Sequence, residues 1–310
     1  MPKFSVIIPV YNTYNYLERC LNSVFNQSFK DFEVIAVNDG STDDSYKIIE
    51  RFEKEHSNLK YFFKDNGGLS SARNYGVSKA CGEYILFLDS DDYYELDLLK
   101  VLNDSLDNCD VVRFSVQDVF DDGSVVKYHD DFFDKTDGFT SFSCICKFHY
   151  VEIACAYCFN RKFWINNKFK FLDKAYHEDF GLIPLVLIKS SSTKSIDYIG
   201  YNYYQRSNSI SKTIEYDKVL KKANDFLNHF EFLKDEGFKC SGDLSIFNSY
   251  IANSVILKST TLKGSDYRNY VRKLRDLGAF DMLLSDTFGR KIKKFLIKIS
   301  PKIYYKLVRR

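Results

Sequence analysis

The sequence predicts an α/β protein in which helices flank a mostly parallel central sheet, with a helical extension after it. In the first hundred residues, short apolar runs typical of buried strands alternate with segments whose apolar residues recur at helical spacing. Strands that alternate with helices imply right-handed crossovers and parallel pairing. Residues 215–280, in contrast, hold a helical pattern that few prolines or glycines interrupt.

Four strands are expected in the first hundred residues, each followed by a polar turn. The apolar runs that predict them are residues 4–10, 32–37, 59–63 and 84–88. Helices are predicted at residues 16–24, 44–55, 69–80 and 95–106. This alternation places the carboxyl ends of all four strands at one edge of the sheet.

The pattern loosens after Asp110, where we expect a hairpin around the turn Asp121-Asp122-Gly123. The hairpin strands are residues 111–119 and 125–129, further strands are predicted at 151–160 and 196–205, and a helix at 181–189. The predicted organisation is an α/β domain at residues 1–210, a helical extension at 211–288 and a basic tail at 289–310.

Composition excludes several classes of protein. With 310 residues, 45% of them hydrophobic and 17% aromatic, the chain can bury a substantial core and is not a disordered protein. A formal net charge of only +2 argues against a general nucleic-acid binder. Met1-Pro2-Lys3 leads directly into a strand, so we expect no signal peptide before the eight cysteines and therefore a reducing cytoplasm.

The tail at residues 289–310 is strongly basic. It contains nine Lys or Arg and no acid, so the formal net charge of residues 1–288 is −7. Apolar residues such as Phe295 and Ile299 recur there at helical spacing among the lysines. A cationic amphipathic helix suits the surface of an anionic membrane, so we expect peripheral attachment to the inner face of the cell membrane. The alternative is a helix packed on the domain with a solvated basic face.

Polar clusters follow each of the first four predicted strands. They are Pro9-Val10-Tyr11-Asn12, Asn38-Asp39-Gly40, Lys64-Asp65-Asn66 and Asp89-Ser90-Asp91-Asp92. Open α/β sheets bind ligands outside the carboxyl ends of their strands. Four such clusters on one edge therefore predict a binding site.

The run Asp89-Ser90-Asp91-Asp92 follows an apolar strand directly. Crowded carboxylates repel unless one is protonated or a cation neutralises them, and a hard divalent ion bound there would keep positions open for phosphate. The alternative is an acidic loop that caps the next helix.

A nucleotide site needs a surface for the base and polar groups for its edge and phosphates. Tyr11 can stack on a base, and Asp39 can accept a hydrogen bond from a base N–H of the kind that uracil offers. Arg73 can place its guanidinium near phosphate or acidic groups. Tyr11 also has an ordinary interpretation as a surface aromatic, and Arg73 as a solvated helix residue.

Five blocks in order and spacing resemble the signature of glycosyltransferase family 2. The blocks are residues 5–12 (SVIIPVYN), 17–24 (LERCLNSV) with Gln27, 32–43 (FEVIAVNDGSTD), 66–76 (NGGLSSARNYG) and 89–92 (DSDD). The resemblance is close over residues 4–100 and looser to about residue 210. It implies a GT-A fold and an inverting transferase that uses a nucleotide sugar with Mn²⁺ or Mg²⁺.

The resemblance also implies roles for individual residues. On the donor side, at residues 1–100, it places Pro9 and Tyr11 around the base, Asp39 on the base edge and Arg73 near the nucleotide. Further along, Tyr203-Tyr204-Gln205-Arg206 resembles a late family element in which Arg206 approaches the diphosphate.

Metal and catalytic roles follow from the same resemblance. Asp91 would be the principal metal ligand, and Asp89 would face the ribose or the metal shell. On the acceptor side, at residues 101–210, Asp179 would be the catalytic base, with Glu178 as its rival. The alternative is that both acids only favour the start of the helix at 181–189.

We therefore expect a hexosyl- or N-acetylhexosaminyltransferase of surface polysaccharide or lipopolysaccharide synthesis. The expected donor is a UDP-sugar and the acceptor a glycan or lipid-linked saccharide. Two other functions remain open at this point. One is a sugar-phosphate nucleotidyltransferase, although residues 9–12 do not form the Gly-rich loop that such enzymes have after the first strand. The other is a catalytically silent glycan-assembly subunit.

Overall fold

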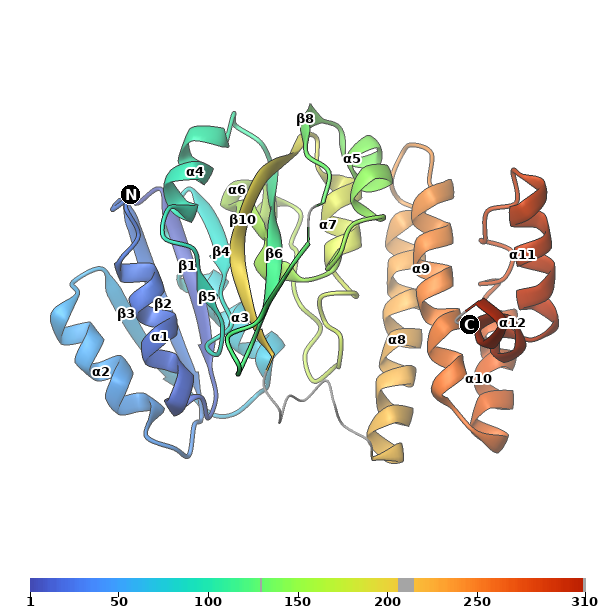
Figure 1. Ribbon diagram of the computed structural model, residues 1–310, viewed down its shortest axis with the longest axis horizontal. Helices are drawn as coiled ribbons and strands as arrows, with labels where there is room; N and C mark the ends of the chain where they lie inside the picture. Colours follow the sequence, from blue (N-terminus) through green and yellow to red (C-terminus); the bar gives the residue numbers. More distant parts are fainter. Residues whose placement is uncertain (129, 206–214, 309–310) are drawn as a thin grey trace.

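The computed structural model describes residues 1–128, 130–205 and 215–308, and within them ten strands form one mixed sheet (Figure 1). The strands are β1 (Phe4–Val10), β2 (Phe32–Asp39), β3 (Leu59–Lys64), β4 (Tyr84–Phe87), β5 (Tyr93–Tyr94), β6 (Val111–Phe120), β7 (Val125–Lys127), β8 (Phe133–Thr136), β9 (Tyr157–Asn160) and β10 (Thr193–Gln205). Their order is β3-β2-β1-β4-β9-β6-β10-β5, with β7 on β6 and β8 on β10.

Strand direction confirms the predicted arrangement of the first half. β1 pairs in parallel with both β2 and β4, and β3 continues the parallel set beside β2. β9 is antiparallel to β4 and to β6, while β6 and β10 are parallel to each other. The carboxyl ends of β1, β2 and β4 therefore lie together at one edge of the sheet.

Helices cover the sheet and continue beyond it. Those within the α/β part are α1 (Tyr14–Phe25), α2 (Ser45–Glu55), α3 (Leu69–Lys79), α4 (Leu98–Ser105), α5 (Gly138–Ile145), α6 (Arg161–Asn166) and α7 (Ile183–Lys189). The helical extension contains α8 (Tyr216–Gly237), α9 (Ser245–Lys258) and α10 (Gly264–Asp276), and the basic tail forms α11 (Phe288–Ile299) and α12 (Pro301–Val308). In Figure 1 the extension stands beside α5 and α7, at the opposite end of the molecule from β3 and α2.

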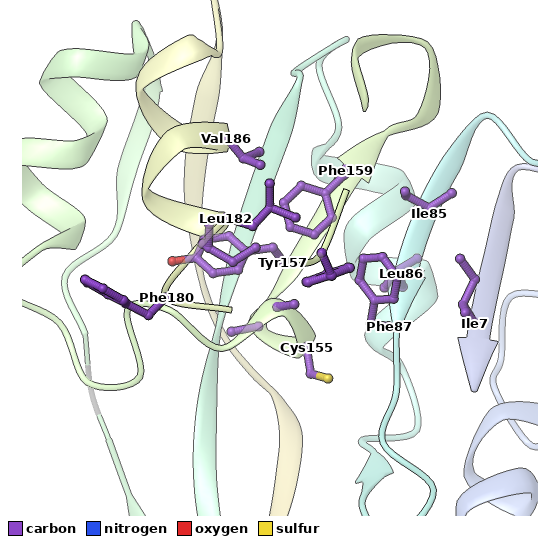
Figure 2. Close-up of a cluster of buried hydrophobic side chains, with 14 of the residues drawn as sticks. Ile7, Ile85, Leu86, Phe87, Cys155, Tyr157, Phe159, Phe180, Leu182 and Val186 are labelled. Atoms are coloured by element: carbon purple, nitrogen blue, oxygen red, sulfur yellow. The ribbon is translucent and has the colours of Figure 1, made fainter. Parts of the chain in front are cut away.

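The core explains why the central strands are apolar along their whole length. Every residue of β1 is buried, because helices cover both faces of the sheet and no face is left to solvent. Figure 2 shows this core running from Ile7 on β1 through Phe87 and Phe159 to Leu182 and Val186 near and on α7. The rings of Phe87 and Phe159 lie 6.1 Å apart, and both residues are fully buried.

Several predicted boundaries were wrong. The helix expected at 95–106 begins at Leu98. Tyr93–Tyr94 form the short strand β5 against β10, and the Glu95 N–H still donates to the Gly200 carbonyl of β10 at 3.0 Å. The strand expected at 151–160 is confined to β9, and a 3₁₀ turn, η1 (Ala154–Ala156), precedes it. The hairpin of β6 and β7 is confirmed, although its expected last residue, 129, lies outside the described residues.

The basic tail is helical, as predicted, and one side of it packs on the extension. Ile297 is fully buried, Lys298 pairs with Asp281 at 2.7 Å, and the Tyr305 hydroxyl donates to Asn253 Oδ1 at 2.6 Å. A second set of apolar side chains points away from this contact. Phe288, Phe295, Ile299, Ile303 and Leu307 are each at least 60% exposed.

Candidate active site

A cleft of about 730 Å³ opens where β1, β2 and β4 end. The loop at residues 174–180, which precedes α7, and one face of α8 complete its walls. Seven of the residues singled out from the sequence line it: Pro9, Tyr11, Asp39, Asp89, Asp91, Glu178 and Asp179. Arg73 lies directly behind the lining, and Arg206 lies outside the described residues.

Two residues shape the end of the cleft at β1 and β2. Tyr11 follows β1 and is 50% exposed, so its ring is available to a flat ligand. Asp39, the last residue of β2, is buried and accepts hydrogen bonds from Lys64 Nζ and from the backbone N–H groups of Gly67 and Gly68, the latter at 2.7 Å. The Asp39 carboxylate therefore holds the Gly67-Gly68 turn against the end of β2.

The three acids after β4 lie in different environments. Asp92 is fully buried and accepts hydrogen bonds from the Tyr201 hydroxyl and, at 2.7 Å, from the Tyr204 N–H. Burial, and then the charges of Asp91 and Asp89, raise the pKa of Asp92 well above its usual range. Asp92 thus joins the acidic turn to β10 instead of capping α4, whereas Asp89 and Asp91 line the cleft.

A single buried cation links acids from two parts of the cleft. Arg73 on α3 is only 1% exposed. Its Nη2 donates to Asp89 Oδ1 at 2.8 Å, and its Nη1 donates to Asp179 Oδ1 at 2.7 Å and to Glu178 Oε1 at 3.0 Å. From the sequence, Arg73 was expected to lie near phosphate or acidic groups. In the structure it contacts acidic groups.

Glu178 and Asp179 do not cap α7. That helix begins at Ile183 after Leu182, with no side-chain cap, and both acids bind Arg73 instead. Asp179 Oδ2 also accepts from the Ala154 N–H at 3.1 Å. Burial raises the pKa of Asp179 to about 7, although the Arg73 charge opposes this increase. Burial raises the pKa of Glu178 as well.

The far end of the cleft is aromatic and basic. Tyr176 and His177 come from the loop before α7, and Lys222 and Phe226 come from α8. The rings of Phe226 and Phe180 stack at 4.4 Å, and the His177 ring meets Phe226 edge-on at 4.6 Å. The helical extension therefore supplies a wall of the cleft.

A sequence model described as glycosyl transferase family 2 matches residues 5–169, more than half of the chain. The chain belongs to glycosyltransferase family 2. This confirms the family expected from the motif blocks, and the matched range includes Arg73 and the acidic turn at residues 89–92.

Curated relatives match about a third of this family 2 chain. It is 45% identical to the glycosyltransferase GlyA of Streptococcus pneumoniae over 100 residues, which are 32% of this chain and 14% of that protein. It is 44% identical to the chondroitin synthase of Pasteurella multocida over 101 residues, 33% of this chain and 10% of that protein. The match thus spans a small part of these relatives' length.

Solved structures resemble this family 2 chain over most of its length at lower identity. Residues 1–349 of TarS from S. aureus, in complex with UDP-GlcNAc, match with a TM-score of 0.60 and 21% identity, over 90% of each chain. The mannosyltransferase PcManGT of Pyrobaculum calidifontis, in complex with GDP-Man and Mn²⁺, matches with a TM-score of 0.55 and 14% identity, over 99% of this chain and 86% of that one. The predicted GT-A fold with a helical carboxyl-terminal region is confirmed.

The residues after β4 fit a divalent cation that also binds phosphate. Among the described residues, no three His, Cys, Asp or Glu side chains gather as a complete ligand set. Asp89 and Asp91 nevertheless place two carboxylates on the cleft, and no donor in the described part of the chain reaches Asp89 Oδ2. Mg²⁺ is typically held by one or two carboxylates together with substrate phosphates, which is the set that this turn could complete.

Some residues of the site were missed in the sequence. Arg19 on α1 donates from Nη2 to the Asp91 carbonyl at 2.8 Å and lies 3.9 Å from the centre of the Tyr204 ring, so it fixes the acidic turn. The motif block at 17–24 contains Arg19, but only the fold shows its partner. Lys222 and Phe226 could not be recognised as site residues from the sequence, because the pattern of their helix is that of an ordinary amphipathic helix.

Proposed function

We propose that this chain is an inverting glycosyltransferase that moves a sugar from a nucleoside diphosphate sugar to a glycan or lipid-linked acceptor during surface polysaccharide or lipopolysaccharide synthesis. The observation that carries the proposal is the single cleft in which the carboxyl ends of β1, β2 and β4 meet Glu178 and Asp179. A donor-binding edge and a pair of buried acids in one cleft are the parts that such a transfer requires.

The donor is proposed to lie along the edge formed by β1, β2 and β4. Tyr11 stacks on the base, beside Pro9, and the loop fixed by Asp39 borders the base edge. A UDP-sugar is the proposed donor, because Asp39 lines the cleft and a carboxylate oxygen can accept a second hydrogen bond, here from the N–H of uracil, beside those from Lys64 and the Gly67-Gly68 turn. Asp91 and Asp89 would hold Mn²⁺ or Mg²⁺, which when bound would stabilise the negative charge of the departing diphosphate.

Asp179 is proposed as the catalytic base. Its carboxylate accepts the proton of the acceptor hydroxyl while the hydroxyl oxygen attacks the anomeric carbon from the side opposite the diphosphate. One displacement inverts the anomeric configuration and needs no covalent intermediate. A pKa near 7 suits this role, because a base of that pKa is both substantially ionised and able to take a proton near neutral pH.

Substitutions test these assignments. Asp91→Ala is expected to abolish metal-dependent transfer, and Asp179→Asn to lower it by a factor of about 10² or more, with the fold retained. Asp104→Ala, an exposed acid on α4, is the matched control. Transfer at the wild-type rate by a folded Asp179→Asn would remove the base assignment and move it to Glu178, which Glu178→Gln would then test.

Donor identity is open to a direct binding measurement. Thermal unfolding is followed with UDP, GDP and CDP, each with and without Mn²⁺, because a ligand that binds the native state raises its stability. UDP with Mn²⁺ is expected to give the largest increase. Mn²⁺-dependent donor hydrolysis then separates an enzyme from a catalytically silent assembly subunit. Family membership already disfavours a nucleotidyltransferase.

The tail is proposed to hold the enzyme on the inner face of the cell membrane, where a lipid-linked acceptor would be available. No helix in the described part of the chain is long and apolar enough to cross a bilayer. The exposed apolar side chains of α11 and α12, together with the nine basic residues of 289–310, suit an anionic headgroup layer.

Vesicle flotation tests this attachment in the full chain. Phe295→Ser/Ile299→Ser is expected to lose binding to vesicles that contain anionic phosphatidylglycerol. The control is Phe63→Ser/Phe238→Ser, two residues outside 289–310 whose side chains are each 61% exposed. Equal flotation of the two variants would refute the attachment.

A further inference from the structure

Lysines gather where α8 borders the cleft. Lys174, Lys221 and Lys222 all line this end. Lys221 is held in place, since its Nζ donates to Asp225 Oδ2 at 2.6 Å and to the Lys174 carbonyl at 3.1 Å. Lys221 and Lys222 both lie over the ring of Tyr176, with their Nζ atoms 4.9 and 5.4 Å from its centre. Lys221 and Lys222 are thus part of an ordered wall.

This wall lies on the acceptor side of the cleft if the proposed function is correct. β2, β1 and β4 provide the donor edge, and α8 stands beyond α7, on the side of the molecule away from these strands (Figure 1). Glu178 and Asp179 lie in the loop that leads into α7. A molecule that offers its hydroxyl to Asp179 from the side opposite the donor therefore meets α8.

The positive charge at this end carries an electrostatic cost. Burial and the charge of Lys218 lower the pKa of Lys222. Lys258, whose Nζ lies 4.2 Å from the centre of the Phe226 ring, also has a lowered pKa, through burial and the charge of Lys222. Asp225 and Glu152 are the acids that act on this group of charges. A bound anion would relieve the repulsion among the lysines.

A buried ring nitrogen at the same place lacks a partner. His177 lines the cleft, and its Nε2 is buried with no hydrogen-bond partner among the described residues. Burial, followed by the charges of Lys258 and Lys222, lowers the pKa of His177 to about 3, so the ring is neutral. Buried polar atoms are rarely left unpaired in folded proteins, and an unexplained one is consistent with a ligand position.

The surrounding surface suits a sugar. Tyr176 and Phe226 line this part of the cleft, and mostly apolar or aromatic walls with a few polar groups are typical of small-molecule sites. We propose that the α8 end of the cleft binds a saccharide acceptor through an anionic group, phosphate or carboxylate, that Lys174 and Lys222 contact. Neutral glycans would then be poorer acceptors than phosphorylated or uronic acid-containing ones.

Two double variants test the proposal in the full chain. Lys174→Met/Lys222→Met removes two cleft lysines and spares Lys221, whose hydrogen bonds are structural. Lys168→Met/Lys218→Met is the matched control: Lys168, like Lys174, has a positive φ in the same connection, and Lys218 lies one turn from Lys222 on α8. Neither control lysine lines the cleft.

Calorimetric titrations with glucose 6-phosphate, glucuronate and glucose are made with saturating UDP and Mn²⁺, so that the donor edge is occupied. We expect the wild type to bind one or both anionic sugars more tightly than glucose. Lys174→Met/Lys222→Met, the cleft variant, should bind these anionic sugars about tenfold more weakly, because a hydrogen bond to a charged group contributes that much affinity. The control variant should bind them as the wild type does. Comparing the titrations with glucose 6-phosphate and with glucuronate shows whether the site prefers a phosphate or a carboxylate. Equal binding of glucose, or equal losses in the two variants, would overturn the proposal.

A parallel loss of UDP affinity in the cleft variant would also overturn it, because the lysines would then serve the donor. Failure of the proposed function has a different signature. If UDP with Mn²⁺ does not bind the wild type at all, the donor assignment fails, and the same titrations without nucleotide still decide whether the α8 lysines bind an anionic sugar.

Discussion

Arg73→Met should destabilise the protein far more than the loss of an ordinary ion pair. Arg73 is buried and contacts three carboxylates at 2.7–3.0 Å, so its removal leaves acids in the interior without a counter-charge. Breaking a buried pair by removing one partner costs about 3–5 kcal/mol. The exposed pair between Arg51 and Glu18, at 2.6 Å, offers the matched control, and Arg51→Met should cost at most about 1 kcal/mol.

Urea unfolding at several pH values measures both variants. Arg73 lowers the pKa of Glu178 and of Asp179, so its loss raises both pKa values in the native state. The native variant then binds protons more readily than the wild type, and the penalty of Arg73→Met should grow as pH rises. Glu178→Gln/Asp179→Asn in the same chain should reduce the penalty, because fewer charges are left unpaired. A cost equal to that of Arg51→Met, or one that shrinks with rising pH, would refute this reasoning.

Three further outcomes are expected. Wild-type kcat/KM for transfer should rise about tenfold per pH unit below an apparent pKa near 7 and level off above it. The reason is that burial raises the pKa of Asp179 to about 7 and only the ionised base accepts a proton. A flat profile from about pH 5 to about 8 would contradict this. Tyr201→Phe removes the hydroxyl bound to the buried carboxylate of the acidic turn and should cost about 1–3 kcal/mol in urea unfolding, whereas a change below about 0.5 kcal/mol would oppose the assignment. Gly181→Ala would place a Cβ 2.2 Å from His229 Nδ1 and should cost about 1–3 kcal/mol, while Gly289→Ala, with open space around it, should cost nothing measurable; equal effects of the two would show that the contact is relieved cheaply.

Local sequence patterns were sufficient for the first hundred residues. The runs that predicted strands at 4–10 and 32–37 correspond to β1 and β2, because a strand covered on both faces must be apolar throughout. Polar clusters at the ends of such strands could then be assigned to one edge from the topology alone. This reasoning predicted that Pro9, Tyr11 and Asp39 belong to one binding site, and all three line the cleft.

Long-range pairing was not visible in the sequence. β5 has only two residues, and it exists because Tyr93 and Tyr94 pair with Asn202 and Tyr201 on β10, more than a hundred residues away. β8, α5 and α6 were missed as well. Short elements carry too little periodicity to be recognised, and their stability comes from tertiary contacts.

The same limit applied to the site. The sequence placed Glu178 and Asp179 before a helix, where a capping role was a sound alternative. Only the fold brings Arg73 within hydrogen-bond distance of both, across a separation of about a hundred residues. The helix α8 was expected as an extension, and its side chains Lys222 and Phe226 instead complete the cleft.

Arg73 also sets the spacing between the two halves of the proposed reaction. Asp89 follows β4 and binds Nη2, whereas Glu178 and Asp179 precede α7 and bind Nη1. Because the guanidinium is planar and rigid, we infer that it fixes a donor-side acid relative to the base. Arg73→Lys keeps the charge but not this geometry, since an ammonium is a point charge on a flexible stem. It should therefore lower transfer while UDP binding with Mn²⁺ persists, and equal losses of both would indicate that Arg73 serves the nucleotide instead.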